Sequence, residues 1–216
     1  MRFDQRVVMV TGAAGNLGRA LARAFADLGA TVAPIGRKDA DLRDAASVQQ
    51  AVDRLLVQHG RIDVLCNIAG AFRMGPALHE TTEADWDFMF DVNAKSVLNM
   101  SRAVVPSMIR NGAGKIVNVG AYAAQKGAAG MGAYVASKSA VMRITETMAA
   151  ELREKNINVN CVLPTIIDTP ENRAAMPKAD PRRWVATADL AAVIVFLASD
   201  AARAMHGAAV PVTGLS

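Results

Sequence analysis

The stretch Val7-Val8-Met9-Val10-Thr11-Gly12-Ala13-Ala14-Gly15-Asn16-Leu17-Gly18 decides the fold of this 216-residue chain. Its first residues form an apolar run typical of a buried strand, and a helical spacing of apolar residues begins at Leu17. The glycines between them let the backbone turn tightly beside a phosphate, and the helix N-terminus adds free N–H groups. A strand, a glycine-rich turn and a helix in this order favour a dinucleotide cradle over an ordinary turn.

The rest of the chain alternates short apolar runs with helical patterns. Further strands are expected at 31–35, 62–66, 115–119, 159–163 and 210–212. Helices are expected on Val48–Leu56, along a long segment through Trp86–Val97 capped by Thr82, over about 134–154, and from a Thr187 cap to Leu197. Because parallel strands need crossover connections, the pattern predicts an α/β fold: one Rossmann-type doubly wound parallel sheet with helices on both faces, over residues 1–216 as a single domain.

One connection in this series is unusually short. Between the strand at 31–35 and the helix that follows Asp44 there is no room for a crossover helix and a paired third strand, which need roughly a dozen residues or more. Pro34 also lies inside that strand, where proline is tolerated mainly at an edge. We therefore expect a trimmed sheet with its second strand at or near an edge.

Composition excludes several classes of protein. With 52% hydrophobic and 20% charged residues the chain is not disordered, and Cys66 and Cys161, both in expected buried strands, do not form a disulfide scaffold. The longest apolar run, Leu190–Ala198, is short of the roughly 20 residues that span a bilayer. The three histidines lack the spacing of a metal site, and the +4 charge is too scattered to indicate nucleic-acid binding. We expect a cytoplasmic protein with no metal, membrane or nucleic-acid partner.

The end of the second strand reads the ribose of a bound dinucleotide. An NAD site usually has an acidic residue there, whereas an arginine accommodates the 2′-phosphate of NADP. This chain has Gly36 at that position, followed by Arg37 and Lys38, which favours NADP(H). Asp39 and Asp41 lie close enough to be recruited, so NAD(H) stays open.

Tyr134 and Lys138 carry the chemistry. Four residues apart, they share one face of the expected helix. A neighbouring cation stabilises a phenolate and should lower the pKa of Tyr134, so that the phenol can donate a proton as hydride arrives. Taken alone, a tyrosine and a lysine at this spacing occur mostly by chance, on an ordinary solvated helix face.

Together, these motifs fall in the order of the short-chain dehydrogenase/reductase family, which the chain resembles over nearly its whole length. The resemblance implies a nicotinamide cofactor and a homodimer or homotetramer through the two long helices. It implies catalysis by Tyr134 and Lys138, with Asn93 holding a relay water. The cofactor contacts that it implies are Gly12, Gly15, Asn16, Leu17, Gly18, Arg37, Asp41, Leu42, Asn67, Ala69, Gly70, Tyr134, Lys138, Pro164, Ile167 and Thr169.

Departures from the family pattern bear on the substrate. Asn16 stands where the family has glycine, and Ala121 stands where it has the catalytic serine. Losing one such hydrogen-bond donor costs about 100- to 1,000-fold in comparable oxyanion sites, so a simple ketone is a poor fit. A quinonoid substrate needs the donor less, because its ring spreads the charge.

One branch of the family, dihydropteridine reductase, has alanine at this place. The chain is similar to it in Gly127–Tyr134 and Val162–Asp180, and a substrate lid is expected at about 165–186, with Trp184 either in the core or over a planar substrate. The expected function is an NAD(P)H-dependent oxidoreductase acting on a small carbonyl or quinonoid compound. The alternative is a cofactor-binding redox sensor or scaffold with little catalysis.

Overall fold

The computed structural model describes residues 1–216, and its centre is a six-stranded, wholly parallel sheet in the order β2-β1-β3-β4-β5-β8. The strands are β1 (Val7–Thr11), β2 (Thr31–Ile35), β3 (Val64–Asn67), β4 (Gly114–Val119), β5 (Ile157–Pro164) and β8 (Ala209–Val212). Every strand of this sheet, β8 included, follows the expected position to within a few residues at each end. The expected doubly wound α/β fold is confirmed.

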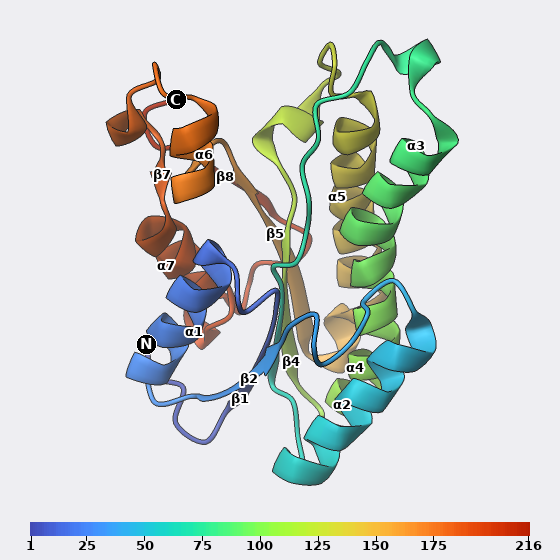
Figure 1. The fold of residues 1–216 in the computed structure, drawn as a ribbon. Coiled ribbons are helices and arrows are strands. Elements are labelled where there is room, and N and C mark those ends of the chain that lie inside the picture. Colours follow the sequence, from blue (N-terminus) through green and yellow to red (C-terminus); the bar gives the residue numbers. More distant parts are fainter.

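Helices cover both faces of the sheet (Figure 1). One face carries α1 (Asn16–Asp27) and α7 (Thr187–Leu197), and the other carries α2 (Ala45–His59), α4 (Ser96–Asn111) and α5 (Gly132–Leu152). The alternation of side chains along β1 explains the two cores, since Val8 and Val10 pack with the first group of helices and Met9 with the second. Each face of the sheet is therefore buried, as parallel sheets require.

The trimmed sheet is also confirmed. β2 pairs only with β1 and forms the edge, so the missing N–H of Pro34 costs no bond to a further strand. The chain passes directly from β2 through the turn at 36–44 into α2, whose first N–H groups are capped by the carboxylate of Asp44. Most of that turn, including Arg37 but not the buried Ala40, is exposed at the sheet edge.

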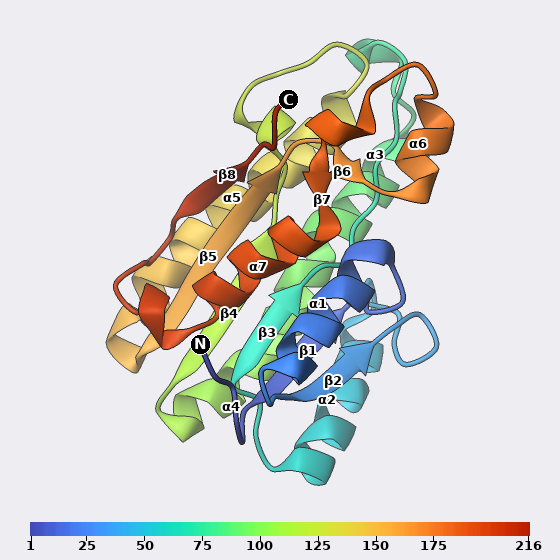
Figure 2. The same cartoon turned by 90° about the vertical axis from the view of Figure 1, so that its left-hand side faces the viewer.

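A separate layer lies beyond the carboxyl ends of the strands (Figure 2). Residues 165–186 contain a two-stranded parallel pair, β6 (Ile167–Asp168) with β7 (Val185–Ala186), and the short helix α6 (Pro170–Ala175). Trp184 is 7% exposed there, so it is a core anchor and not an exposed cover. Single 3-10 turns occupy Leu78–Glu80, Tyr122–Gln125, Arg153–Lys155, Pro181–Arg183 and Asp200–Ala202.

Two helix expectations need correction. The long helix through 86–97 is α3 (Glu83–Phe90), then one π turn over Asp91–Lys95, then α4; its Thr82 cap is confirmed, accepting from the N–H of Asp85 at 3.1 Å. The Thr187 cap is wrong. Thr187 is the first helical residue of α7, and Ala186 precedes it with no side-chain bond.

Both cysteines and most methionines of the long helices lie in the core. Cys66 and Cys161 are buried and unpaired, and burial raises the pKa of both thiols. Of the methionines on the long helices, Met89, Met100, Met108 and Met142 lie in the core. None of the helices combines the length and the apolar character needed to cross a membrane.

Candidate active site

The glycine-rich turn between β1 and α1 packs so closely against neighbouring backbone that a side chain would not fit at Gly12 or Gly18. Gly12 has φ +65°, and a Cβ there would lie 3.0 Å from the Cα of Ala69. A Cβ on Gly18 would lie 2.7 Å from the Cα of Ala13, so only glycine allows this close approach. Gly15 caps α1 with no side-chain acceptor, which leaves the N–H groups of the first helical turn, including that of Leu17, free of a side-chain partner.

Thr11 joins this turn to the next strand. Its hydroxyl accepts from the N–H groups of Ile68 and Ala69 at 3.0 and 3.1 Å and donates to the carbonyl of Cys66 at 3.4 Å. The segment after β3 is thereby held against the glycine turn. Sequence reasoning missed Thr11, although a threonine directly before the first glycine was a visible signal.

A second cluster forms where Gly70, Asn93 and Lys138 meet. A Cβ added to Gly70 would lie 3.0 Å from both Asn93 Oδ1 and Lys138 Nζ, so glycine is required between them. Asn93 projects from the π turn, and its amide exchanges hydrogen bonds with the backbone of Ala71 at 2.9 and 3.1 Å. Its Nδ2 also donates to the hydroxyl of Ser137 at 3.0 Å. The extra residue of a π turn re-aims nearby groups, and such turns are frequent at functional sites.

Lys138 is buried beside this cluster. Its ammonium donates to the carbonyl of Val119 at 2.8 Å, and burial lowers its pKa to about 8. No carboxylate contributes to that pKa. The one ionisable side chain that does, the Cys161 thiol, is neutral at pH 7 because burial raises its pKa to about 11. A cation held this way is available to a polar group that enters the site.

Tyr134 lies one helical turn before Lys138 on α5. Its ring packs edge-on against Phe72 with centroids 4.8 Å apart. The expected lowering of its pKa by Lys138 is not found, because burial raises the pKa of Tyr134 to about 12. The phenol therefore holds its proton at neutral pH.

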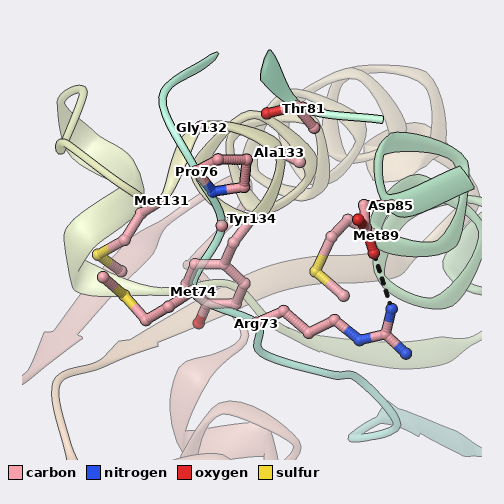
Figure 3. Close-up of a pocket in the computed structure, with 11 residues that line it drawn as sticks. Arg73, Met74, Pro76, Thr81, Asp85, Met89, Met131, Gly132, Ala133 and Tyr134 are labelled. Atoms are coloured by element: carbon pink, nitrogen blue, oxygen red, sulfur yellow. Dashed lines mark hydrogen bonds and ion pairs between the residues drawn. The ribbon is translucent and has the colours of Figure 1, made fainter. Parts of the chain in front are cut away.

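A small pocket opens beside this phenol (Figure 3). Its volume is about 80 Å³, and Met74, Met89 and Met131 line it together with Tyr134. Arg73 and Asp85, joined by an ion pair of 3.0 Å, are the two charged residues of its wall. The Tyr134 side chain thus borders a space with mainly apolar walls, whose polar groups are the Arg73–Asp85 pair and the hydroxyl of Thr81.

The layer of residues 165–186 reaches the glycine turn through one contact. Asn16 donates from Nδ2 to Glu171 of α6 at 2.7 Å, and its Oδ1 accepts from Arg19 at 2.8 Å. Arg19 also donates to the carbonyl of Ala14 within the turn. The residue that departs from the usual glycine therefore ties the cradle to α6.

Known proteins resemble this chain in both sequence and fold. Residues 37–180 match the model described as short chain dehydrogenase. D-threitol dehydrogenase of Mycolicibacterium smegmatis is 35% identical over 99% of this chain and 93% of its own. L-xylulose reductase of Bos taurus is 33% identical over 99% and 97%. The structure of NAD+-bound xylitol dehydrogenase superposes with a TM-score of 0.91 at 26% identity, over 99% of this chain and 100% of that one.

The chain belongs to the short-chain dehydrogenase family. As such it is an oxidoreductase that works with a nicotinamide cofactor. The resemblance noted from the motifs is thus confirmed at the level of the family, and the finer likeness to dihydropteridine reductase stays a hypothesis.

The residues of this short-chain dehydrogenase fit a dinucleotide. The glycine turn leaves its α1 N–H groups free for phosphate oxygens, and the cradle is one that a Cβ would fill. Asn67, at the carboxyl end of β3, donates to Asn118 at 2.8 Å, while its buried Oδ1 accepts no hydrogen bond. An unpartnered buried oxygen beside Ala69 and Gly70 suits a donor from a bound molecule.

Several residues expected to contact adenine or nicotinamide already make hydrogen bonds within the protein. Asp41 is held by Arg43 through bonds of 2.9 and 2.8 Å, which lower its pKa to about 2, and the carbonyl of Leu42 accepts from Asn99. The hydroxyl of Thr169 caps α6. Ile167 packs at the margin of the core, and Pro164 ends β5. Their cofactor contacts remain predictions.

Ala121 is buried just beyond β4, at 4% exposure, where the family pattern has serine. Tyr122, the nearest hydroxyl in that segment, is 43% exposed and forms part of a 3-10 turn. Among the residues that line the pocket with Tyr134, Thr81 is the only other one with a hydroxyl (Figure 3).

Proposed function

We propose that this short-chain dehydrogenase transfers hydride between NADP(H) and a small carbonyl or quinonoid compound, with Tyr134 as the proton donor. The observation that carries this proposal is the Tyr134 phenol, protonated at neutral pH, beside a pocket and one helical turn from the buried ammonium of Lys138. When bound, the nicotinamide supplies the hydride. Tyr134 donates its proton to the substrate atom that gains charge, which suits the reductive direction.

Lys138 and Asn93 assist this proton transfer: Lys138 stabilises the phenolate, and Asn93 helps to position Tyr134. Once Tyr134 has given up its proton, the phenolate is stabilised by a nearby cation, and Lys138 is cationic below pH about 8. Asn93 holds the backbone at Ala71 and the hydroxyl of Ser137, and Ser137 in turn donates to the carbonyl of Tyr134 at 2.8 Å. Asn93 thus holds both the segment that leads to Arg73 of the pocket and the helix that carries Tyr134. A relay water at Asn93 is part of this proposal.

NADP(H) is favoured by the state of the charges at the end of β2. Arg37 and Lys38 are exposed and have no ion-pair partner. The nearby carboxylates are committed, because Asp39 accepts from the N–H of Gly36 at 2.7 Å and Asp41 binds Arg43. Free cations and occupied acids favour a 2′-phosphate over a 2′-hydroxyl.

Replacing Arg37 by alanine tests this preference. We expect the dissociation constant of NADPH to rise by about tenfold or more, because a charge-assisted bond to phosphate is lost, while that of NADH changes little. Titration of both cofactors by fluorescence measures this, with Arg102→Ala on the exposed face of α4 as control. Equal losses for NADPH and NADH would show that Arg37 does not read the phosphate.

The substrate proposal rests on Ala121. Without a serine to hold a developing oxyanion, the site suits a conjugated compound of the kind that dihydropteridine reductase reduces, because its ring spreads the charge. Ala121→Ser should leave reduction of quinones and quinonoid dihydropterin within about twofold and raise kcat/KM for simple ketones by about tenfold or more. The measurement is NADPH consumption across a panel of these compounds. A wild-type enzyme that already reduces simple ketones faster than every quinonoid compound contradicts this assignment.

We propose residues 165–186 as a lid over the bound cofactor and substrate, supported by the Asn16–Glu171 contact. We also propose a homodimer or homotetramer through the long helices, supported by the exposed Leu98 and Ile109 on α4. Sedimentation of the full chain checks the second point.

A further inference from the structure

We propose that the Arg73–Asp85 pair makes the pocket selective for substrates whose far end is a neutral hydrogen-bonding group, such as an amide or a hydroxyl, and that it disfavours carboxylates. This inference rests on the proposed function, because it takes the pocket beside Tyr134 as the substrate pocket. It goes further by assigning the residues that read the part of the substrate away from the reacting atom.

The pair forms the polar corner of the pocket. Nη1 of Arg73 lies 3.0 Å from Oδ1 of Asp85, and both side chains line the same cavity as Tyr134 (Figure 3). The other lining residues carry no charge, and Met74, Met89 and Pro76 make the walls apolar. A substrate that reaches Tyr134 with one end therefore meets apolar walls along its body, and its other end can meet only this pair as a charged partner.

Neighbours hold both members of the pair in place. The guanidinium carbon of Arg73 lies 3.8 Å from the ring centroid of Phe88, which fixes its plane. The second carboxylate oxygen of Asp85 accepts from the hydroxyl of Thr82 at 2.9 Å, and the N–H of Asp85 donates back to that hydroxyl. This reciprocal cap anchors Asp85 in the first turn of α3. The pair is thus ordered before any ligand enters.

The charges of the pair decide what it can bind. Arg73 uses one nitrogen for Asp85, and its Nε and Nη2 donate to no other protein group. Those N–H groups can donate to a carbonyl or hydroxyl oxygen, and the carboxylate of Asp85 can accept from an amide N–H or a hydroxyl. A carboxylate substrate would meet Arg73 and Asp85 together, so it would lose hydration without a net attraction. A neutral amide or hydroxyl can instead form hydrogen bonds with both Arg73 and Asp85.

A matched pair of aldehydes tests this selectivity. In 4-formylbenzamide and 4-formylbenzoate the same ring carries a reducible group at one end and either a neutral amide or a carboxylate at the other. We expect the wild-type enzyme with saturating NADPH to favour the amide in kcat/KM by about tenfold or more. Asp85→Asn leaves Arg73 uncompensated and keeps an acceptor for Thr82, so the ratio should shift toward the carboxylate by about tenfold or more.

The control is Asp87→Asn, which removes the same charge from an exposed position on the same helix outside the pocket. It should leave the amide-to-carboxylate ratio unchanged. A ratio that shifts equally in Asp85→Asn and Asp87→Asn would reflect only the overall charge and would overturn the inference. So would a wild-type enzyme that prefers the carboxylate.

Binding measured without turnover separates this inference from the proposed function. Equilibrium dialysis of both aldehydes against wild type, Asp85→Asn and Arg73→Met should reproduce the selectivity, and Arg73→Met should weaken binding of the amide by about tenfold. If the aldehydes bind selectively and are not reduced, the proposed function fails and the specificity of the pair stands. If they are reduced and every variant binds both equally, or if neither binds, the inference fails.

Discussion

Burying the ammonium of Lys138 destabilises the folded protein. Its pKa falls from the ordinary 10.5 to about 8, so the folded state disfavours the charged form. The penalty is present in full below pH about 8 and disappears as the pH rises from about 8 to 10.5, because the unfolded chain then also loses this proton. A shift of this size corresponds to about 3 kcal/mol. A burial penalty of this kind is expected where the function of the site requires the buried ammonium.

Lys138→Met should therefore stabilise the enzyme while abolishing its activity. At pH 7 we expect the free energy of unfolding to rise by about 2 kcal/mol, because the relieved burial outweighs the roughly 1 kcal/mol of the lost bond to the Val119 carbonyl. Urea unfolding at pH 7 and at pH 10 measures it, and the gain should shrink at the higher pH. The exposed Lys126→Met is the control. A variant less stable than wild type at pH 7 contradicts this account of Lys138.

The sequence predicted that Tyr134 and Lys138 share one helical face, but it predicted neither the protonation of Tyr134 nor the Arg73–Asp85 pair of the pocket. The spacing of Tyr134 and Lys138 indicated two groups on one helical face, and both lie there. The pKa of Tyr134 was predicted to fall and instead rises, because burial disfavours the charged phenolate. Burial is a property of the packed site, to which Phe72 contributes from a segment distant in sequence.

At the scale of elements, the Asn16–Glu171 hydrogen bond links the start of α1 to α6 across 155 positions of sequence. In the proposed closed state this contact holds the lid against the cofactor cradle. Breaking it should speed cofactor release, because one bond to a charged carboxylate is lost from the closed form.

Asn16→Ala should raise the dissociation rate of NADPH by about three- to tenfold with a smaller change in the association rate. Stopped-flow displacement of the cofactor measures both rates. Glu171→Gln keeps an acceptor for Asn16 and should fall between wild type and Asn16→Ala. A dissociation rate that is unchanged in Asn16→Ala means that this contact does not hold the lid.

Element boundaries were predicted where the apolar pattern was continuous and missed where a local device interrupts it. The strands and the Thr82 cap follow from apolar runs and a capping residue. The π turn at Asp91–Lys95 carries the same apolar spacing as its flanking helices, so nothing in the pattern reveals the extra residue. Thr187 looked like a cap, yet the chain leaving β7 turns one residue earlier.

At the scale of the molecule, the short connection after β2 and Pro34 were enough to predict the trimmed sheet and its edge. The path of residues 165–186 could not be predicted. It depends on long-range contacts such as Thr165 with Thr213, at 2.9 Å, and the pairing of β6 with β7. These contacts follow no local periodicity, so a single sequence carries no signal for them.

The central claim is that Tyr134 delivers the proton that accompanies hydride transfer. The most direct measurement is NADPH oxidation by Tyr134→Phe with the best quinonoid substrate, run beside NADPH binding and beside Tyr122→Phe, which alters the other tyrosine, an exposed one. The account predicts that Tyr134→Phe loses kcat by about 100-fold or more, binds NADPH within about twofold of wild type, and differs from an unaffected Tyr122→Phe. Turnover by Tyr134→Phe at the wild-type rate would contradict it.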